Sequence, residues 1–296
     1  MFRVSGTTPT TLLVITTVVL MSFWSCLFGC RRTPSPTASP RQTAGVLQRL
    51  GIFYGWPSAF DGATSAEQAA TKLGRYQVVV LGGGLEQPGH GDHQPTRRIM
   101  AQLLRGGVEV HGYIPLGSST ALSQGQIMQR VKAWKAMGAT GIFFDEAGHD
   151  YGNTRQRQNQ AFKAVHRQGM KVFANAWNPR DLFDTSKSPP HNPTGAVTEL
   201  TAGDCYLYES FGLSEGQPET EQARQEKMAR LEPARQLGIR IFGVTTAPSA
   251  GFFDAAAWQR VVEEARRLGL EGLGWGEYQF GAQDNRMPDR PFPPAR

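Results

Sequence analysis

Two acidic residues lie at the ends of two short apolar runs of the chain. Asp145 ends the run Gly-Ile-Phe-Phe-Asp at residues 141–145, and Glu209 ends the run Cys-Tyr-Leu-Tyr-Glu at residues 205–209. A buried isolated charge is costly, so an acid in such a place must be paired, hydrogen-bonded or functional. Glycoside hydrolysis requires two facing carboxyl groups, one as acid and the other as nucleophile or base. We predict that Asp145 and Glu209 are this pair; the alternative is that either acid pairs with an arginine or caps a loop.

A second acid, Glu146, directly follows Asp145. Side chains alternate between the two faces of a strand, so Asp145 shares its face with Gly141 and Phe143, while Glu146 lies on the other face. The crowded axis of a barrel favours small residues, so we expect the face of Gly141 to point inward. Asp145 then points into the mouth of a barrel, and Glu146 has a supporting role.

Other predicted strand ends carry aromatic rings, an amide and a further acid. Rings stack on the apolar faces of sugars, and amides and acids reach the hydroxyl groups. Each such residue taken alone is more often a packing residue, but their common position favours a carbohydrate cleft. The predicted substrate-binding residues are Tyr54, Trp56, Tyr113, Glu146, Asn175, Trp177, Tyr208, Trp275 and Glu277.

One unit repeats along the chain from about residue 46: a short apolar run, a polar loop and an amphipathic helix. Alternating strands and helices favour parallel pairing, and about eight units favour closure into an α/β fold, the (β/α)8 TIM barrel. The weak unit is the fifth, because the Pro-rich residues 179–200 offer only a short helix, and an open doubly wound sheet is the alternative. The predicted strands are 51–56, 77–81, 108–115, 141–145, 171–177, 205–209, 240–245 and 270–275. The clearest predicted helices are 126–137, 155–168, 219–237 and 255–268.

The first residues have the pattern of an export signal. Arg3 precedes an apolar, uncharged stretch that ends before Cys30, and a Pro-rich segment follows. This end resembles a bacterial lipobox, in which the cysteine becomes lipid-modified and anchors the protein to a membrane. An uncleaved signal anchor or plain secretion is the alternative, and each places the body outside the cytoplasm, in the cell envelope or beyond. The predicted parts are a signal at 1–29, a lipidated cysteine and tether at 30–45, a barrel at 46–285 and a Pro-rich tail at 286–296.

The composition limits the classes of function. Apolar residues make up 40% of the 296 residues and charged residues 19%, which indicates a globular chain. The net charge is +6, but no dense basic run with interleaved aromatic residues is present, so we expect no nucleic-acid partner.

Metal and cysteine chemistry are not favoured. No Cys/His spacing indicates a zinc site, and Cys205 is expected to be a buried core residue. We therefore expect a monomer without a cofactor or metal, although a metal-dependent hydrolase that uses His90, Asp92 and His93 is a further hypothesis.

Four segments resemble the glycoside hydrolase family 114-type barrels, the endo-α-1,4-polygalactosaminidase-like and spherulation-specific-like proteins. They are residues 112–114 (Gly-Tyr-Ile), 141–148 (GIFFDEAG), 175–179 (Asn-Ala-Trp-Asn-Pro) and 208–210 (Tyr-Glu-Ser), and the resemblance extends over most of residues 50–280. It implies that Asp145 is the nucleophile or stabiliser, that Glu209 is the acid/base, and that Asn175 holds a substrate hydroxyl or orients an acid.

The same resemblance implies an endo-acting hydrolase of a polysaccharide that contains amino sugars. Residues 146–149, with Glu146 and His149, are nearer the spherulation-type pattern, and the basic balance of the chain opposes a cationic polymer. Because fold does not imply function, the alternative is a non-catalytic glycan-binding lipoprotein on the same scaffold.

Overall fold

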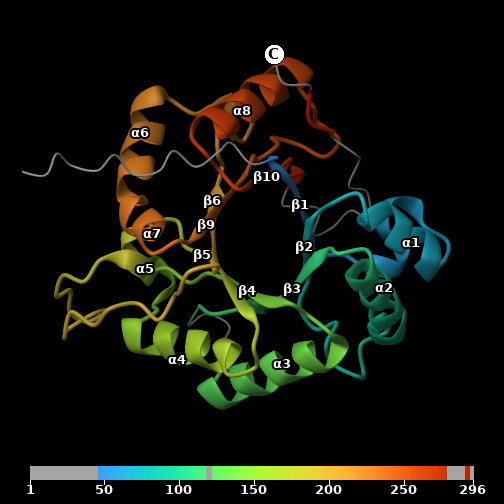
Figure 1. The fold of residues 1–296 in the computed structure, drawn as a ribbon, viewed down its shortest axis with the longest axis horizontal. Coiled ribbons are helices and arrows are strands. Elements are labelled where there is room, and N and C mark those ends of the chain that lie inside the picture. The colour runs from blue at the N-terminus through green and yellow to red at the C-terminus, as the bar shows by residue number, and fades with distance from the viewer. Residues whose placement is uncertain (1–45, 118–121, 279–290, 294–296) are drawn as a thin grey trace, which may run out of the picture. The chain divides into compact units, whose positions relative to one another are not determined.

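The computed structural model describes residues 46–117, 122–278 and 291–293, and in this part of the chain eight parallel strands close into a barrel. Figure 1 shows the helices arranged outside this ring of strands. The predicted (β/α)8 barrel is therefore confirmed, and each predicted strand is present. In the order around the barrel, the strands are β1 (Gln48–Phe53), β10 (Gly272–Gly274), β9 (Arg240–Val244), β6 (Cys205–Glu209), β5 (Lys171–Asn175), β4 (Gly141–Asp145), β3 (Glu109–Pro115) and β2 (Val78–Leu81).

The helices follow the strands as expected, with one difference. The helix predicted at 219–237 is two helices, because Pro233 has no amide hydrogen to continue α6 and instead occupies the first turn of α7. After β5 the chain makes only one helical turn, α5, as the prolines predict. The helices are α1 (Ala66–Leu73), α2 (His93–Arg105), α3 (Gln124–Met137), α4 (Arg155–His166), α5 (Arg180–Phe183), α6 (Glu221–Arg230), α7 (Glu232–Gln236) and α8 (Ala255–Arg267), with short 3-10 turns η1 (Pro57–Gly62) and η3 (His149–Tyr151).

Apolar side chains form two separate layers. Phe143 and Phe173 pack inside the barrel with Cys205 and Leu207, whereas Phe144 packs outward against the α4 ring of Phe162. The inward face of β4 is thus the one that carries Gly141 and Asp145, as the alternation predicts. A glycine is required at position 141 because a Cβ atom there would lie 2.3 Å from His111 Nδ1. Glycine has no Cβ atom and so leaves room for the His111 ring.

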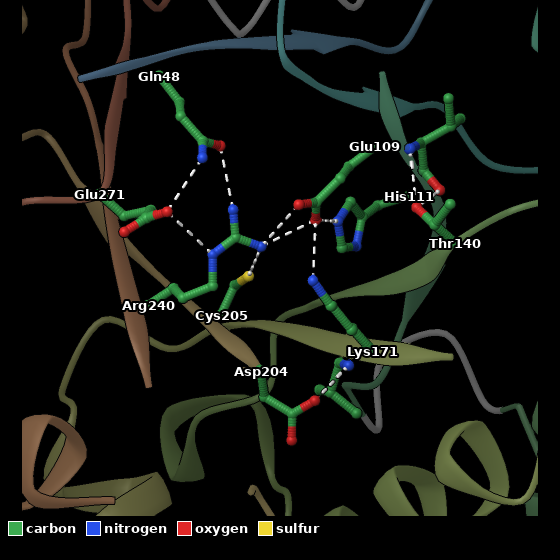
Figure 2. Close-up of polar contacts among 11 residues, drawn as sticks. Gln48, Glu109, His111, Thr140, Lys171, Asp204, Cys205, Arg240 and Glu271 are labelled. Atoms are coloured by element: carbon green, nitrogen blue, oxygen red, sulfur yellow. Dashed lines mark hydrogen bonds and ion pairs between the residues drawn. The ribbon is translucent and has the colours of Figure 1, made fainter. Parts of the chain in front are cut away.

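A cluster of charged groups, here called the base cluster, lies where the strands begin (Figure 2). Arg240 at the start of β9 is its centre, and its Nη1 donates to Glu109 Oε2 at 2.8 Å and Oε1 at 3.0 Å. Its Nη2 donates to Gln48 Oε1 at 3.0 Å, and its Nε donates to Glu271 Oε1 at 3.3 Å. Lys171 Nζ lies 3.5 Å from Glu109 Oε2. These contacts tie β1, β3, β5, β9 and the start of β10 together at one end of the barrel.

Several sequence predictions lie outside the described residues. They are the signal at 1–29, the lipidated Cys30 with its tether at 30–45, and most of the predicted tail at 286–296. Within the described ranges, no helix combines the length and the apolar character needed to cross a bilayer.

Candidate active site

The structure brings Asp145 and Glu209 together at the mouth of the barrel. Asp145 ends β4, Glu209 ends β6, and Asn175 ends β5, which lies between them in the sheet. The side-chain amide nitrogen of Asn175 donates to Asp145 Oδ1 at 3.1 Å and to Glu209 Oε2 at 3.2 Å. One amide therefore bridges the two predicted catalytic acids, and both acids are half-buried.

Asp145 is the more strongly held of the two acids. Its Oδ2 accepts a hydrogen bond from the Tyr113 hydroxyl at 3.0 Å, and its Oδ1 also accepts one from the Glu146 amide at 2.9 Å. Tyr54 stands behind Tyr113, with the two ring centroids 5.0 Å apart and the planes at 67°. Burial, followed by the charge of Asp145, raises the pKa of both tyrosines, so each phenol keeps its proton, and Tyr113 donates its proton to the hydrogen bond with Asp145.

Burial also shifts both acids toward their neutral forms. It raises the pKa of Asp145, although hydrogen bonds from the Glu146 amide, Tyr113 and Asn175 act in the opposite direction. It raises the pKa of Glu209 as well, and the charge of Asp145 adds to that effect. No Lys or Arg side chain in the described part of the chain forms an ion pair with either carboxyl group. Two carboxyl groups in this position favour sharing a proton, with one neutral and one charged.

The backbone takes the same unusual conformation after each acid. Glu146 has φ 54° and Ser210 has φ 58°, which is the left-handed region that non-glycine residues rarely adopt. Neighbouring side chains hold the two turns: Asn153 Nδ2 donates to the Glu146 carbonyl at 2.5 Å, and the hydroxyls of Ser210 and Thr246 lie 2.5 Å apart. Such conformations cost roughly 1–3 kcal/mol each and cluster at active sites. Nothing in the sequence pattern predicted them.

Two further groups support the mouth without having been predicted. Arg130 of α3 pairs with the buried Glu86, and its Nη2 donates to the Tyr113 carbonyl at 3.4 Å. Lys227 of α6 places its Nζ 4.4 Å from the centroid of the Trp177 ring and donates to the Glu209 carbonyl at 3.4 Å. Both come from helices, so the polar residues at the strand ends did not indicate them.

The remaining predicted substrate-binding residues have different positions. Trp177 is 57% exposed and Trp56 is 53% exposed, the latter with its ring 5.6 Å from that of His90. The side chain of Glu146 lies beside Gly117 on the loop after β3, and Glu277 is buried after β10.

Two of the predicted contacts are not at the mouth. Tyr208 is 1% exposed and faces the helices, because it neighbours the inward-facing Glu209, and its hydroxyl donates to Glu219. Trp275 is 4% exposed and packs against Phe253 and Trp258, with ring centroids 4.9 and 5.7 Å away. Both rings belong to the layer between strands and helices, so their assignment to the substrate is corrected.

His90, Asp92 and His93, the residues of the metal hypothesis, form hydrogen bonds that stabilise the loop in which they lie. Asp92 Oδ2 accepts hydrogen bonds from the Ser58 amide at 3.0 Å and the Thr96 hydroxyl at 3.2 Å. His93 Nδ1 lies 2.8 Å from the Leu85 carbonyl, and His90 Nδ1 accepts from the Asp92 amide at 3.0 Å. Among the described residues, no group of three His, Cys, Asp or Glu side chains is arranged to hold a metal ion.

Comparisons with known proteins show a similarity of fold. No protein-family model matches the chain, and no curated protein matches its sequence. The glycoside hydrolase domain of PelA from Pseudomonas aeruginosa is 13% identical, with a TM-score of 0.48, over 77% of this chain and 94% of that one. Ega3 from Aspergillus fumigatus, solved with galactosamine, is 11% identical, with a TM-score of 0.48, over 84% of this chain and 97% of that one. Amy13B from Eubacterium rectale is 8% identical, with a TM-score of 0.50, over 78% of this chain and 65% of that one. At such identities the similarity concerns the barrel fold alone.

Proposed function

We propose that this protein is a retaining glycoside hydrolase that cleaves a polysaccharide outside the cytoplasm, with Asp145 as nucleophile and Glu209 as acid/base. The observation that carries the proposal is the Asn175 amide, which bonds to both carboxyl groups at the ends of β4 and β6. Both acids are half-buried, and in the described part of the chain neither carboxyl group forms an ion pair, which is typical of functional rather than structural acids.

The separation of the two acids is compatible with retention of configuration. Because one nitrogen contacts both, Asp145 Oδ1 and Glu209 Oε2 lie no more than about 6.3 Å apart, which brings one oxygen of each carboxyl group close to the other group. Retaining enzymes hold their carboxyl groups about 5–5.5 Å apart, so that one of them attacks the sugar directly.

The hydrogen bonds favour one assignment of roles. Asp145 accepts from Tyr113, Asn175 and the Glu146 amide, and these three donors stabilise a carboxylate. Glu209 accepts from Asn175, and burial next to Asp145 raises its pKa, which suits an acid that holds a proton at neutral pH. In this scheme Glu209 protonates the leaving oxygen while Asp145 bonds to the anomeric carbon. Glu209 then removes a proton from the water that releases the sugar.

The substrate and location are parts of the same proposal. The sequence resemblance to the family 114-type barrels favours an endo-acting enzyme on a polymer that contains amino sugars. The N-terminal pattern favours attachment to the cell envelope through a lipid on Cys30. A panel of amino-sugar and neutral polysaccharides, assayed for release of reducing ends, would identify the polymer.

Chemical rescue tests the roles of the two acids. We expect Asp145→Gly to lose hydrolysis of 2,4-dinitrophenyl glycosides and to recover their turnover with azide. We expect Glu209→Gly to lose hydrolysis of polymer, whose leaving sugar needs a proton, and azide to speed its turnover of 2,4-dinitrophenyl glycosides, whose leaving group needs none. Azide should give a glycosyl azide of inverted configuration with the first variant and of retained configuration with the second. Folded variants that hydrolyse the identified polymer at the wild-type rate would refute the proposal, and melting curves control for folding.

A non-catalytic glycan-binding protein is the second candidate. The exposure of the Trp56 and Trp177 rings favours it, because exposed rings bind sugars without chemistry. Retention on a polysaccharide column, together with no release of reducing ends from any polymer in the panel, would support this candidate over the enzyme.

A further inference from the structure

A cavity adjoins Glu209 on the side of the barrel covered by α6. Its volume is about 360 Å³, and its walls include Trp177, Glu209, Ser214, Ala223, Lys227 and Arg230. A cavity of this volume accommodates a small ligand and is within the size range of small-molecule sites. In this cavity the exposed ring of Trp177 lies beside Glu209, the proposed acid/base.

Lys227 fixes that aromatic ring. Its Nζ lies 4.4 Å from the centroid of Trp177 and 4.3 Å from that of Tyr208, and it donates to the Glu209 carbonyl at 3.4 Å. Cation–π contacts of this kind contribute about 0.5–2 kcal/mol, depending on exposure. The ammonium group therefore ties the Trp177 ring to the backbone of Glu209. The ring keeps 57% of its surface exposed.

A larger hollow adjoins the cavity. A second hollow of about 860 Å³ shares Glu226 and Arg230 with the first and is lined by Arg180 and Ser186 on one side and by Ala229 on the other. It exists because α5 is a single helical turn, which leaves space between the α5 segment and the helices α6 and α7. The two hollows therefore adjoin each other along α6, and we call them together the α6 path.

The charges of this path do not favour a charged ligand. Glu219 Oε2 accepts from the Gly212 amide at 3.0 Å, and its other oxygen accepts from the Tyr208 hydroxyl. Glu226 lies 3.8 Å from Arg230. Acids and bases are thus both present, and the exposed ring is the feature that selects a ligand. The apolar face of a pyranose ring matches it.

We propose that this cavity binds the leaving-group sugar and that the reducing-end part of the polymer continues along α6, with Trp177 as the stacking surface and Lys227 as its positioning residue. The proposal rests on the proposed function, because the sugar whose oxygen Glu209 protonates must lie beside Glu209. The leaving group of a glycosidase is the sugar on the reducing-end side. The position of Glu209 therefore defines the direction of the chain.

Substrates with and without a leaving-group sugar separate this proposal from the proposed function. A 2,4-dinitrophenyl glycoside has a leaving group that is not a sugar, so its hydrolysis by the wild type tests the acid pair alone. We expect Trp177→Ala to lower the ratio of kcat/KM on polymer to kcat/KM on the aryl glycoside about tenfold or more. Lys227→Met should lower the ratio in the same direction, and Lys227→Arg should restore most of it. An unchanged ratio in Trp177→Ala overturns the subsite, whereas a wild type inactive on both substrates overturns the proposed function.

Blocking the α6 path tests the direction of the chain and avoids the residues around Glu209. Ala229→Trp fills the larger hollow, so oligosaccharides labelled at the reducing end should bind with fewer sugars beyond the cleavage point and release shorter labelled fragments. Gln225→Trp, one helical turn earlier on α6 and outside the lining of both hollows, is the matched control and should leave the fragment pattern unchanged. Longer labelled fragments from Ala229→Trp, or an unchanged pattern, would overturn the assigned direction.

Discussion

At the base of the barrel, Glu109 lies against the guanidinium of Arg240, whereas at the mouth Asp145 and Glu209 receive hydrogen bonds from neutral groups. Burial acts on all three acids, yet the outcomes differ. Hydrogen bonds from Arg240 and the nearby ring of His111, whose Nε2 lies 3.7 Å from Glu109 Oε2, overcome burial at the base and hold the pKa of Glu109 well below its usual value. At the mouth burial prevails, and the pKa of each acid is raised.

The difference separates a structural cluster from a chemical one. In the base cluster the charges are paired within 3.5 Å, so the folded state stabilises them and no reactive group remains. At the mouth, burial disfavours the negative charge that Asp145 needs as a nucleophile. For the same reason the pair of acids retains a proton, which Glu209 can donate. A buried acid beside an arginine indicates stability, and a buried acid pair among amides and phenols indicates reactivity.

The largest expected effect contrasts Glu209→Gln at the mouth with Glu109→Gln at the base. We expect Glu209→Gln to lower kcat on polymer by about 10²–10⁴-fold, the usual contribution of a general acid. Its Tm at pH 7 should be higher than that of the wild type, because folding no longer has to protonate a carboxyl group at this position. Glu109→Gln should show the reverse, near-normal kcat and a lower Tm. Equal effects of the two variants on kcat would contradict the distinction.

The second prediction concerns the centre of the base cluster. Arg240→Met leaves Glu109 without its main partner, and we expect a loss of about 2 kcal/mol of unfolding free energy, less than the roughly 3–5 kcal/mol of a fully buried pair because the cluster is partly solvated. Urea denaturation measures it. The double variant Arg240→Met/Glu109→Gln should recover part of the loss, and strictly additive effects would show that the two residues do not interact.

The third and smallest effect is the dependence of stability on pH, which should have opposite signs at the two ends. The pKa values of Asp145 and Glu209 are raised above 3.8 and 4.5, so unfolding releases protons and stability falls as the pH rises from those values. Burial lowers the pKa of His111 below 6.5, so unfolding takes up a proton and stability falls as the pH drops below that value.

Variants at each end should remove one limb of the Tm–pH curve. Asp145→Asn should flatten the decline above pH 3.8, because residue 145 no longer titrates and the Tyr113 hydroxyl can turn to accept from the new amide. His111→Asn should flatten the decline below pH 6.5. Changes of both limbs in one variant would mean that the two ends are not independent.

The sequence predicted the strands better than their surroundings. β4 and β6 have the expected bounds because an acid ends each apolar run, and alternation along β4 correctly turned Asp145 inward. The same alternation, applied to Glu209, excludes Tyr208 from the mouth. The role of Gly141 was not predictable, because it depends on His111 from the neighbouring strand.

Contacts that depend on helix placement could not be predicted. Lys227 contacts the Glu209 carbonyl and the Trp177 ring from α6, and no pattern along the chain specifies how this helix packs beside β6. The bridge made by Asn175 depends on the twist of three adjacent strands, which spacing along the chain does not determine. Patterns in one segment indicate which face a residue occupies, and packing between segments decides what it contacts.

Cys205 gives the base cluster a built-in reporter. Its Sγ lies 3.8 Å from Arg240 Nη1 inside the barrel, and burial raises the pKa of the thiol to about 12. Thiolate is the form that reacts with disulfide reagents, so the closed barrel resists labelling. The rate at which such a reagent modifies Cys205 under native conditions therefore counts the openings of the barrel at its base. The same labelling rate, measured in variants of the mouth, would show whether opening at one end of the barrel spreads to the other.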